Sequence, residues 1–469
     1  MTRNVVAAGI ESAAPPGLAH TSVWGMGKVI ALEHPELWGG MIDLAPRPTD
    51  EEAAELLAEL DGEGFEDHIL LRAGRRYVGR VEPVAEPAAV PAPLRAEGSY
   101  LITGGLGVLG LHVARWMVGQ GARSLVLVGR REPSLAARDA VEALRRAGAR
   151  VTVAGADVAS AVELEGVLAA IEASMPPLRG IVHAAGVAGD QPLAGLDADA
   201  LHAVLCPKIR GAWLLHRLTS HLDLDLFVCF SSIAAVWGSK GQAHYAAANY
   251  FLDALADYRR QRGLPAISIG WGPWDGGGMA TAEARSRLAR VGVRALDPED
   301  ALAAMQRSLA SPHPRIVIAD VDWARFREVY EAARVRPLLE ALWPETAPVD
   351  APPAIRSVPL ASECAHLPAA ERRDWLVAHV QREVASVLGL SDEERPDPTK
   401  GFFRLGMDSL MAVELKNRLA AGFRVPLSAT VVFDYPNIAE LSAYLAESML
   451  GWERPAAVGG EDAEPEREA

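Results

Sequence analysis

Residues that could do chemistry gather in FVCFSSIAAVWGSKGQAHYAAAN, the stretch from Phe227 to Asn249. The apolar run that begins at Leu226 predicts a buried parallel strand ending at Ser232, and a glycine-rich loop then leads into a helix that opens at about Tyr245. The i, i+4 spacing puts Tyr245 and Asn249 on one helix face, and an open α/β sheet holds its reacting groups at the carboxyl ends of its strands. A serine, a tyrosine and an amide would therefore converge. The bare pattern fits an ordinary strand, loop and helix better, so the case for chemistry depends on the sequence upstream.

A glycine-rich turn upstream could hold a dinucleotide. The predicted strand SYLIT runs into TGGLGVLG, from Thr103 to Gly110, and then into the predicted helix LHVARWMVGQG. Gly105, Gly107 and Gly110 form G-x-G-x-x-G, in which the glycines allow a tight turn and close approach of a pyrophosphate, whose charge the helix N-terminus favours. The pattern alone is weak, but here it follows a strand and opens a helix, which is the context that supports it.

The ends of the next three strands indicate which dinucleotide is bound. After the second strand, where an enzyme for NAD would place an acid, the sequence GRR offers Arg130, which suits a 2′-phosphate, and we therefore predict NADPH. Arg131 fits a solvated loop arginine. Asp157, at the end of the third strand, fits the rim of an adenine pocket and the cap of the next helix equally well. The run HAAG, from His183 to Gly186, lets the backbone approach the cofactor, and His183 itself fits a structural role better than a catalytic one.

These groups must be positioned by a sheet that spans Ser99 to about Trp343. Short apolar runs alternate there with amphipathic stretches, which predicts a doubly wound, Rossmann-like parallel sheet in an α/β fold. The seven predicted strands are SYLIT, SLVLVG, VTVAGAD, GIVHAAG, LFVCFSS, AISIGWG and RIVIADVDW.

Composition narrows the class of protein. The chain has 469 residues, half of them apolar, and a formal net charge of -15, which argues against nucleic acid or an anionic membrane surface as the main partner. No apolar run approaches the ~20 residues that span a bilayer, and the N-terminus lacks the pattern of a signal peptide, so we expect a cytoplasmic protein. Cys206, Cys229 and Cys364 lack ligand spacing. We predict no metal site and interpret them as buried or incidental thiols.

Two Pro/Ala-rich stretches divide the chain into domains. The first domain looks like the back half of an α/β unit, with a helix and a strand between Val23 and Leu44, a second helix opened by a cap at Thr49, and two short strands. The last domain has three amphipathic stretches and predicts a small all-α bundle of about four helices. The expected divisions are 1–83, a linker 84–98, 99–343, a linker 344–369, 370–450, and a disordered acidic tail 451–469.

The segment 99–343 resembles a short-chain dehydrogenase/reductase, specifically the ketoreductase domain of modular type I polyketide synthases. The motifs that carry the resemblance are TGGLGVLG, GADVAS, HAAGV, CPKIRGAW, FSSIAAVWGSKGQAHYAAANYFLDALA and WGPW. Most members of the superfamily have a lysine four residues after the tyrosine. Here Asn249 holds that place and Lys208 lies upstream, an exchange characteristic of the polyketide synthase branch.

The resemblance implies roles for these residues. Tyr245 would be the general acid that protonates the ketone oxygen, with its pKa lowered by the ammonium of Lys208. Ser232 would donate a hydrogen bond to the same oxygen, and Asn249 would hold Lys208 or a proton-relay water. The expected cofactor residues are Thr103, Gly105, Leu106, Gly107, Gly110, Arg130, Asp157, Val158, His183, Ala184 and Ala185.

Markers of stereochemistry are mixed. Trp237, eight residues before Tyr245, resembles the tryptophan of A-type domains, which give an L-configured hydroxyl, although it also fits loop packing. B-type domains carry Leu-Asp-Asp, and the matching stretch here retains only Asp190. The A-type interpretation is preferred. The glycine-rich, then amphipathic region from Trp274 to Leu296 is typical of a substrate lid.

The outer domains extend the resemblance. The sequence GFFRLGMDSLMAVELKNRL resembles acyl carrier proteins, which implies that Ser409 carries 4′-phosphopantetheine, although Asp408 and Ser409 also fit a simple helix cap. Residues 1–83 resemble the later part of the family's non-catalytic structural subdomain, so we expect a truncated subdomain in a piece of a longer synthase, with an exposed strand edge.

The sequence thus predicts NADPH-dependent reduction of a carrier-tethered β-ketoacyl thioester to a β-hydroxyacyl thioester. The implied partners are the carrier in the same chain, upstream synthase domains and a phosphopantetheinyl transferase. One alternative is a carrier and scaffold whose reductase is inactive or only epimerises an α-substituent. Another is a free-standing reductase of small molecules, which the attached carrier disfavours.

Overall fold

The computed structural model divides the chain into two units. Unit 1 comprises residues 1–326 and 336–343, and unit 2 comprises 327–335 and 344–469. Most of both predicted linkers, nearly all of the predicted tail, Cys364 and Asp408 lie outside the described residues. The described residues are 1–6, 17–61, 66–85, 94–332, 335–343, 367–388, 390, 394–407, 409–423, 425, 427–428, 430–450 and 452.

Seven parallel strands form the main sheet of unit 1, as the apolar runs predict. Their order is β12-β10-β9-β8-β5-β6-β7, and every neighbouring pair is parallel. The chain starts at β5 in the middle, winds outward to β7 and returns through β8, so the predicted doubly wound topology is confirmed. The strands are β5 (Ser99–Thr103), β6 (Ser124–Gly129), β7 (Arg150–Gly155), β8 (Leu178–His183), β9 (Leu226–Ser232), β10 (Ile267–Trp271) and β12 (Arg315–Ile318).

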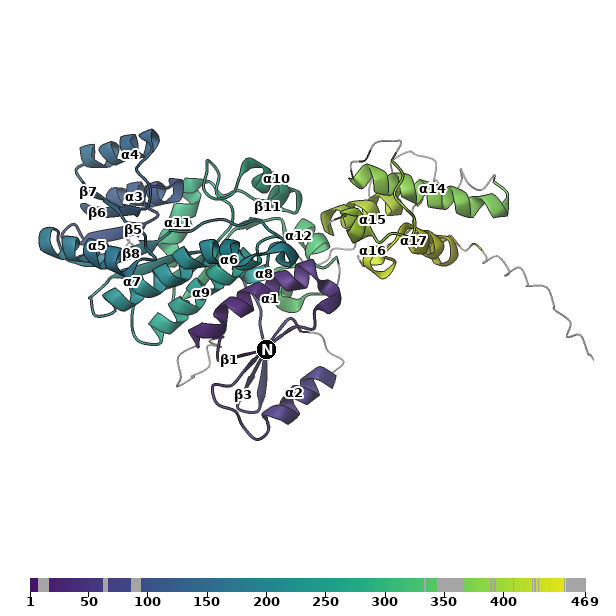
Figure 1. Cartoon of the computed structure of the whole chain (residues 1–469), viewed down its shortest axis with the longest axis horizontal. Helices are drawn as coiled ribbons and strands as arrows, with labels where there is room; N and C mark the ends of the chain where they lie inside the picture. Colours follow the sequence, from purple (N-terminus) through teal and green to yellow (C-terminus); the bar gives the residue numbers. More distant parts are fainter. Residues whose placement is uncertain are drawn as a thin grey trace, which may run out of the picture. The chain divides into compact units, whose positions relative to one another are not determined.

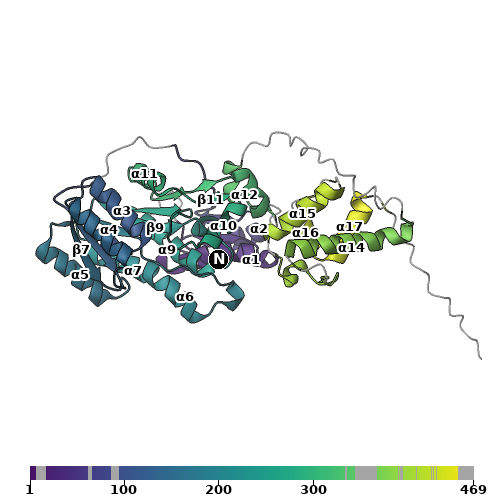
Figure 2. The ribbon, with the colours of Figure 1, turned by 90° about the horizontal axis from the view of Figure 1, so that it is seen from above.

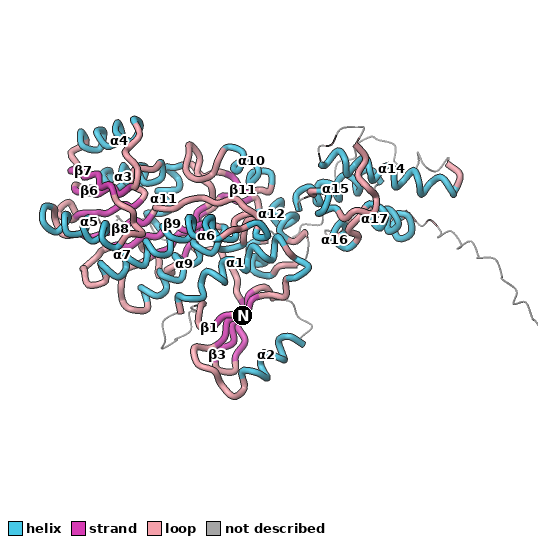
Figure 3. Tube along the Cα trace, viewed as in Figure 1, coloured by secondary structure: helices cyan, strands magenta, loops and turns pink. Residues whose placement is uncertain are grey.

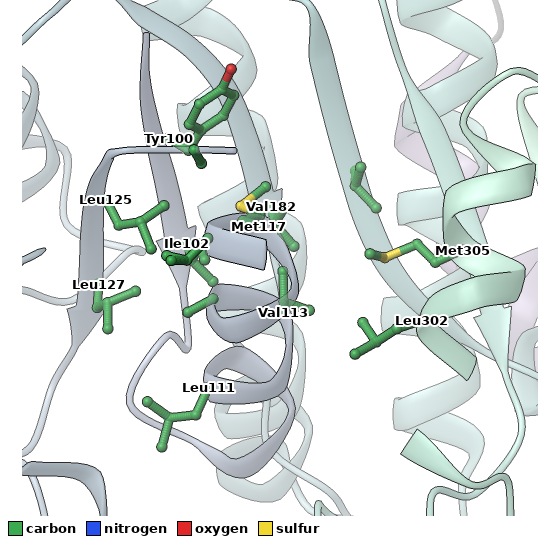
Figure 4. Close-up of a cluster of buried hydrophobic side chains, with 14 of the residues drawn as sticks. Tyr100, Ile102, Leu111, Val113, Met117, Leu125, Leu127, Val182, Leu302 and Met305 are labelled. Atoms are coloured by element: carbon green, nitrogen blue, oxygen red, sulfur yellow. The ribbon is translucent and has the colours of Figure 1, made fainter. Parts of the chain in front are cut away.

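Alternate side chains of these strands enter two cores, one on each face of the sheet. Ile102 and Leu127 pack with Val113 on one face (Figure 4), and Leu101 and Ile181 enter the other core. All five side chains are fully buried, which explains the continuous apolar runs. The first face is covered by α3 (Val108–Gly119), α4 (Leu135–Arg146) and α11 (Pro298–Ser308), and the second by α5 (Ala161–Ser174), α7 (Gly211–Thr219) and α9 (Ala243–Arg260) (Figure 1).

The N-terminal segment forms a second, smaller sheet in the order β1-β2-β3-β4 (Figure 3). The first three strands are parallel, and β4 closes an antiparallel hairpin on β3 whose turn residues Ala73 and Gly74 both have positive φ. The predicted helix cap at Thr49 is wrong: the helix begins at Glu52, because the Thr49 carbonyl closes a turn with the Glu52 N–H. The elements are β1 (Thr2–Arg3), α1 (Thr21–Glu33), β2 (Met41–Leu44), α2 (Glu52–Asp61), β3 (His68–Arg72) and β4 (Arg75–Val78).

Helix α1 lies directly along α9, so the N-terminal segment is packed on the helix that carries Tyr245 (Figure 1). The approach is close because Gly25 faces α9: a Cβ at Gly25 would lie 2.5 Å from the Ala246 carbonyl oxygen. A Cβ at Gly238 would likewise lie 2.6 Å from the Lys28 carbonyl oxygen. Gly25 therefore lets α1 meet α9 backbone to backbone, and Gly238, at the end of α8, does the same for the contact between that end and α1.

Shorter elements complete unit 1, and one of them, α12, crosses the division between the two units after Phe326. Strands β11 and β13 pair antiparallel. The remaining elements are η1 (Leu18–His20), η2 (Pro35–Leu37), η3 (Leu193–Gly195), α6 (Ala198–Leu205), the π-helical turn η4 (Cys206–Arg210), α8 (Ala234–Trp237), α10 (Ala282–Arg290), β11 (Val293–Arg294), β13 (Asp320–Val321), α12 (Trp323–Tyr330) and η5 (Pro337–Leu342).

Unit 2 is helical, as predicted (Figure 2). One apolar face of each helix enters a common core that includes Leu376, Phe402, Leu415, Ile438 and Leu441, all of them fully buried. The helices are α14 (Ala369–Leu388), η6 (Phe402–Leu405), α15 (Ser409–Phe423), α16 (Val431–Asp434) and α17 (Ile438–Tyr444), which continues as the π-helical turn η7 (Leu445–Met449). Helix α15 begins at the predicted attachment residue, whose side chain lies outside the described part of the chain.

Candidate active site

The structure brings the four predicted catalytic residues to one edge of the main sheet. Ser232 is the last residue of β9, and Tyr245 and Asn249 lie one turn apart near the start of α9. Lys208 reaches the same place from the π-helical turn η4. The connection between β9 and α9 differs from the predicted glycine-rich loop, because α8 makes a helical turn in it and the Ser232 Oγ accepts a hydrogen bond from the Ala234 N–H at 3.2 Å.

Lys208 is a buried ammonium. Its Nζ donates a hydrogen bond to the Phe230 carbonyl oxygen at 2.8 Å and lies 5.7 Å from the centre of the Tyr245 ring. The side chain passes over Gly186, where a Cβ would lie 2.7 Å from the Lys208 Cε. Burial lowers the pKa of Lys208 to about 8. π-Helical turns are rare and often occur at functional sites, and here the turn directs Lys208 toward the carboxyl end of β9.

Tyr245 is a protonated phenol at neutral pH. Burial raises its pKa, and hydrogen bonds with Asn249 and Ser232 oppose that rise. The expected lowering by Lys208 is therefore wrong for this geometry, because desolvation of the phenolate outweighs the other effects. A phenol that keeps its proton is the form that a general acid requires.

The side-chain amide of Asn249 forms a hydrogen bond within the first turns of α9 through its nitrogen, and its oxygen has no partner among the described residues. Its Nδ2 donates to the Tyr245 carbonyl oxygen at 2.8 Å. Its Oδ1 is buried and has no hydrogen-bond partner among the described residues. The bond from Lys208 goes to Phe230, so the structure brings Asn249 and Lys208 to the same site without a direct hydrogen bond between them.

The glycine turn has the close approaches that a pyrophosphate cradle needs. A Cβ at Gly110 would overlap the Gly104 carbonyl oxygen, and a Cβ at Gly105 would lie 2.7 Å from the Ile102 carbonyl oxygen. Gly107 is the N-terminal flanking residue of α3. Sequence reasoning missed Gly104, which has φ 66° and makes the turn itself; the doubled glycine in TGG was the available signal. These residues fit a bound dinucleotide.

The strand ends beside this turn are joined by buried polar contacts. The Thr103 Oγ1 and the His183 Nδ1 lie 2.8 Å apart, and the N–H groups of Ala184 and Ala185 donate to the carbonyl oxygen and the Oγ1 of Thr103. Burial, followed by the charge of Lys208, lowers the pKa of His183 to about 3, so the imidazole is neutral. The contact between Thr103 and the neutral His183 links the ends of β5 and β8, which are neighbours in the middle of the sheet.

Arg130 and Asp157 line one cavity of about 460 Å³. The Asp157 carboxylate accepts a hydrogen bond from the Ala159 N–H, while the cap of α5 is Ser160, so Asp157 is not the helix cap itself. Sequence reasoning missed Arg210, a second guanidinium on the wall of this cavity, because only the fold brings η4 to the end of β6. The other lining residues are Ala159, Ser160, Ala161, Val162, His202, Ala203, Cys206 and Pro207.

Two more predicted cofactor residues flank these groups. Leu106 covers the end of β6, since a Cβ at Gly129 would lie 3.0 Å from the Leu106 Cδ1. Val158 is buried in the second core. Of the cysteines, Cys229 is buried in the same core, and Cys206 is half-buried with its Sγ 3.2 Å from the His202 Nε2.

The two stereochemical markers occupy different surroundings. Trp237 is 3% exposed, with its ring centre 6.0 Å from that of Trp323 and 5.5 Å from that of Phe326. Asp190 is exposed and forms an ion pair of 2.9 Å with Arg287 of α10. Trp237 therefore packs within an aromatic cluster, and Asp190 contacts the predicted lid.

The predicted lid begins with a loop of glycines in a conformation that other residues rarely adopt. Gly276, Gly277 and Gly278 all have positive φ. Cβ atoms at Gly277 and Gly278 would lie 3.2 Å and 3.7 Å from side-chain atoms of Val108 and Leu109, so this loop lies over the first turn of α3. Within the described ranges no cluster of His, Cys, Asp or Glu side chains could hold a metal ion, and no helix is long and apolar enough to cross a membrane.

Comparison with known proteins identifies the family. A family model described as a KR domain matches residues 98–276. The solved structure of PlmKR1, a ketoreductase from the first module of phoslactomycin biosynthesis in Streptomyces sp. HK803, is 37% identical with a TM-score of 0.70, and the match covers 74% of this chain and 80% of that one. This chain belongs to the ketoreductases of modular polyketide synthases.

Two further likenesses describe the context of this polyketide synthase ketoreductase. The structure of an A1-type ketoreductase is 41% identical with a TM-score of 0.69, covering 73% of this chain and 72% of that one. Polyketide synthase GfsA of Streptomyces halstedii is 41% identical over 98% of this chain, which spans only 6% of that protein. A model described as a phosphopantetheine attachment site matches residues 378–445, so the same chain holds a carrier domain. Ketoreductases of this family use NADPH, and the carrier holds 4′-phosphopantetheine.

Proposed function

We propose that this ketoreductase reduces a β-ketoacyl thioester, held on the phosphopantetheine of the carrier domain, to a β-hydroxyacyl thioester. The observation that carries the proposal is the convergence of Ser232, Tyr245, Asn249 and Lys208 at the end of β9. When bound along the glycine turn, NADPH supplies the hydride that reduces the ketone carbon. The chain's own residues orient the ketone, stabilise the charge on its oxygen and supply the proton.

The ketone oxygen needs two hydrogen-bond donors and one proton. The hydroxyls of Ser232 and Tyr245 orient the carbonyl and stabilise the negative charge that develops on its oxygen. Tyr245 then gives its proton to that oxygen, and the burial that raises the pKa of Tyr245 favours the protonated phenol before the reaction. Lys208, which is mainly charged at pH 7, and the open Oδ1 of Asn249 support the return of a proton to the phenolate.

The direct test is Tyr245→Phe, assayed by loss of NADPH absorbance with a short β-ketoacyl thioester mimic. We expect reduction to be lost while NADPH still binds, because the glycine turn is untouched. Tyr258→Phe is the matched control, since it removes a hydroxyl from the same helix α9 and should reduce normally. Near-normal turnover in Tyr245→Phe would remove this residue from its role. A wild-type protein that binds NADPH without reducing the mimic would favour the epimerase or scaffold.

We propose an A-type product, with an L-configured hydroxyl. Trp237 and the absence of a complete Leu-Asp-Asp support this assignment, as does the likeness to a structure named as an A1-type ketoreductase. Trp237 would act by shaping the backbone of α8 through its contacts with Trp323 and Phe326. Chiral chromatography of the reduced mimic tests the assignment, and a D-configured product would refute it.

We also propose how the carrier takes part. A phosphopantetheinyl transferase would modify Ser409 at the start of α15, and the flexible arm would present the ketone to the reductase at a high effective concentration. Upstream synthase domains would supply the acyl chain, in the cytoplasm where NADPH is available. Mass spectrometry after incubation with coenzyme A and a transferase tests the modification directly.

A further inference from the structure

The carboxylate of Glu33 joins two loops that border the active site. Glu33 ends helix α1 of the N-terminal segment. Its Oε1 accepts a hydrogen bond from the Gly241 N–H and its Oε2 accepts one from the Leu193 N–H, each at 2.7 Å. The partners lie 208 and 160 residues away in sequence, so the side chain links three separate parts of the fold.

Both loops lie close to the groups that the proposed reaction uses. Gly241 lies in the loop between α8 and α9, four residues before Tyr245. Leu193 opens the turn η3, three residues after Asp190. The loops are also bonded to each other, because the Gln191 N–H donates to the Gly241 carbonyl oxygen at 2.7 Å. The peptide groups of Gly241 therefore hold the Asp190 loop on one side and Glu33 on the other.

The position of Glu33 at the C-terminal end of α1 is unfavourable for an acidic residue within the helix itself. A carboxylate in the last turn of a helix faces the negative end of the helix dipole, and the last turn of α1 holds no basic residue. The two N–H groups from the loops compensate the charge instead. Gly241 has φ 76°, and a Cβ there would overlap the Asp190 carboxylate, so the loop is closely packed where Glu33 binds it.

We propose that Glu33 is a positioning residue, which sets the distance between the loop before Tyr245 and the Asp190 loop and thereby the orientation of the ketone. This inference rests on the proposed reduction. Glu33 touches no reacting atom and lies outside the glycine turn. Its loss should therefore impair substrate use and stereocontrol while NADPH binding is unchanged.

The test compares Glu33→Gln and Glu33→Ala with Glu51→Gln, an exposed carboxylate of the same segment, in the full chain. Because displacement of a reacting group by about an ångström can cost up to about 100-fold, we expect Glu33→Ala to lower kcat/KM roughly ten-fold and to raise the share of the minor alcohol. Glu33→Gln keeps one acceptor oxygen and should fall between Glu33→Ala and the wild type. Unchanged kcat, KM and product configuration in both variants would overturn the proposal, even if their melting temperatures fall.

Hydrogen–deuterium exchange tests the contacts of Glu33 without any measurement of catalysis. Amides in the peptides that contain Leu193 and Gly241 should exchange faster in both Glu33 variants, and those of Glu51→Gln should match the wild type. If the wild type reduces no ketone, the proposed function fails, yet the exchange experiment still decides whether Glu33 holds the two loops. Equal exchange in all four proteins would refute that contact.

Discussion

Replacing Lys208 with methionine should make this ketoreductase more stable and inactive at the same time. Methionine has a similar length and no charge, so it can fill the buried site while removing the ammonium beside Tyr245. The expectation rests on the pKa of Lys208, which burial lowers from 10.5 to about 8. At pH 7 the folded protein holds a buried charge that the unfolded chain holds in water.

The size of the effect follows from that pKa. At 1.36 kcal/mol per pKa unit, ionised Lys208 destabilises the folded state by roughly 3 kcal/mol. The variant also loses the hydrogen bond that this ammonium donates to the Phe230 carbonyl oxygen, and a hydrogen bond to a charged group contributes about 2 kcal/mol. We therefore expect a net gain of about 1 kcal/mol in the free energy of unfolding at pH 7.

The lowered pKa of Lys208 also predicts how the free energy of unfolding changes with pH. Between pH 8 and 10.5 the unfolded chain binds more protons at this lysine than the folded protein does, so wild-type stability should rise with pH across that window. The Lys208→Met variant should lack this rise, and its advantage should shrink toward pH 10. Turnover of the wild type should fall above about pH 8, as the ammonium loses its proton.

Urea unfolding of the full chain at pH 7 and pH 10, with NADPH oxidation in parallel, measures both effects. Lys400→Met removes an exposed lysine of unit 2 and should change neither stability nor activity. A Lys208→Met variant that is less stable than the wild type at pH 7, or that retains the wild-type rise with pH, would refute the argument from burial. A variant that still reduces the mimic would refute the role of Lys208.

Three further outcomes are expected from the same geometry. Arg130→Ala should raise the KM for NADPH about ten-fold or more and change the KM for NADH little, whereas Arg131→Ala should leave both unchanged; equal losses with both cofactors would contradict a 2′-phosphate contact. Gly110→Ala should weaken NADPH binding and lower the melting temperature, because its Cβ would overlap the Gly104 carbonyl oxygen, and normal binding by calorimetry would show that the turn tolerates it. Ser409→Ala should block phosphopantetheine loading, as seen by mass spectrometry, while reduction of the free thioester mimic continues.

The main sheet was predictable because its strands are buried on both faces. Tyr100, Leu101 and Ile102 are all fully buried, so the run SYLIT carries a signal that is independent of the rest of the fold. The glycine turn was predictable for a related reason, since it follows such a strand and opens a helix. Local sequence contains enough information wherever one element and its immediate neighbour determine the geometry.

The remaining features depend on contacts between distant residues. The π-helical turn that presents Lys208 has no period in sequence that distinguishes it from the adjoining helices. Trp237 packs on Trp323, 86 positions later, and its partners could not be known before the fold. The pKa of Tyr245 was predicted with the wrong sign, because the sequence shows that a lysine exists but not how deeply the phenol is buried.

The contact between α1 and α9 bears on the engineering of chimeric synthases. The sequence alone favours a fusion junction between residues 83 and 98, because this stretch precedes the first strand of the main sheet. Such a junction would pair α9 with a foreign α1, and any residue other than glycine at the position of Gly25 would meet the Ala246 carbonyl oxygen, directly after Tyr245. Transplants of this reductase should therefore keep their own N-terminal segment, β1 included, so that the catalytic helix retains its own packing surface.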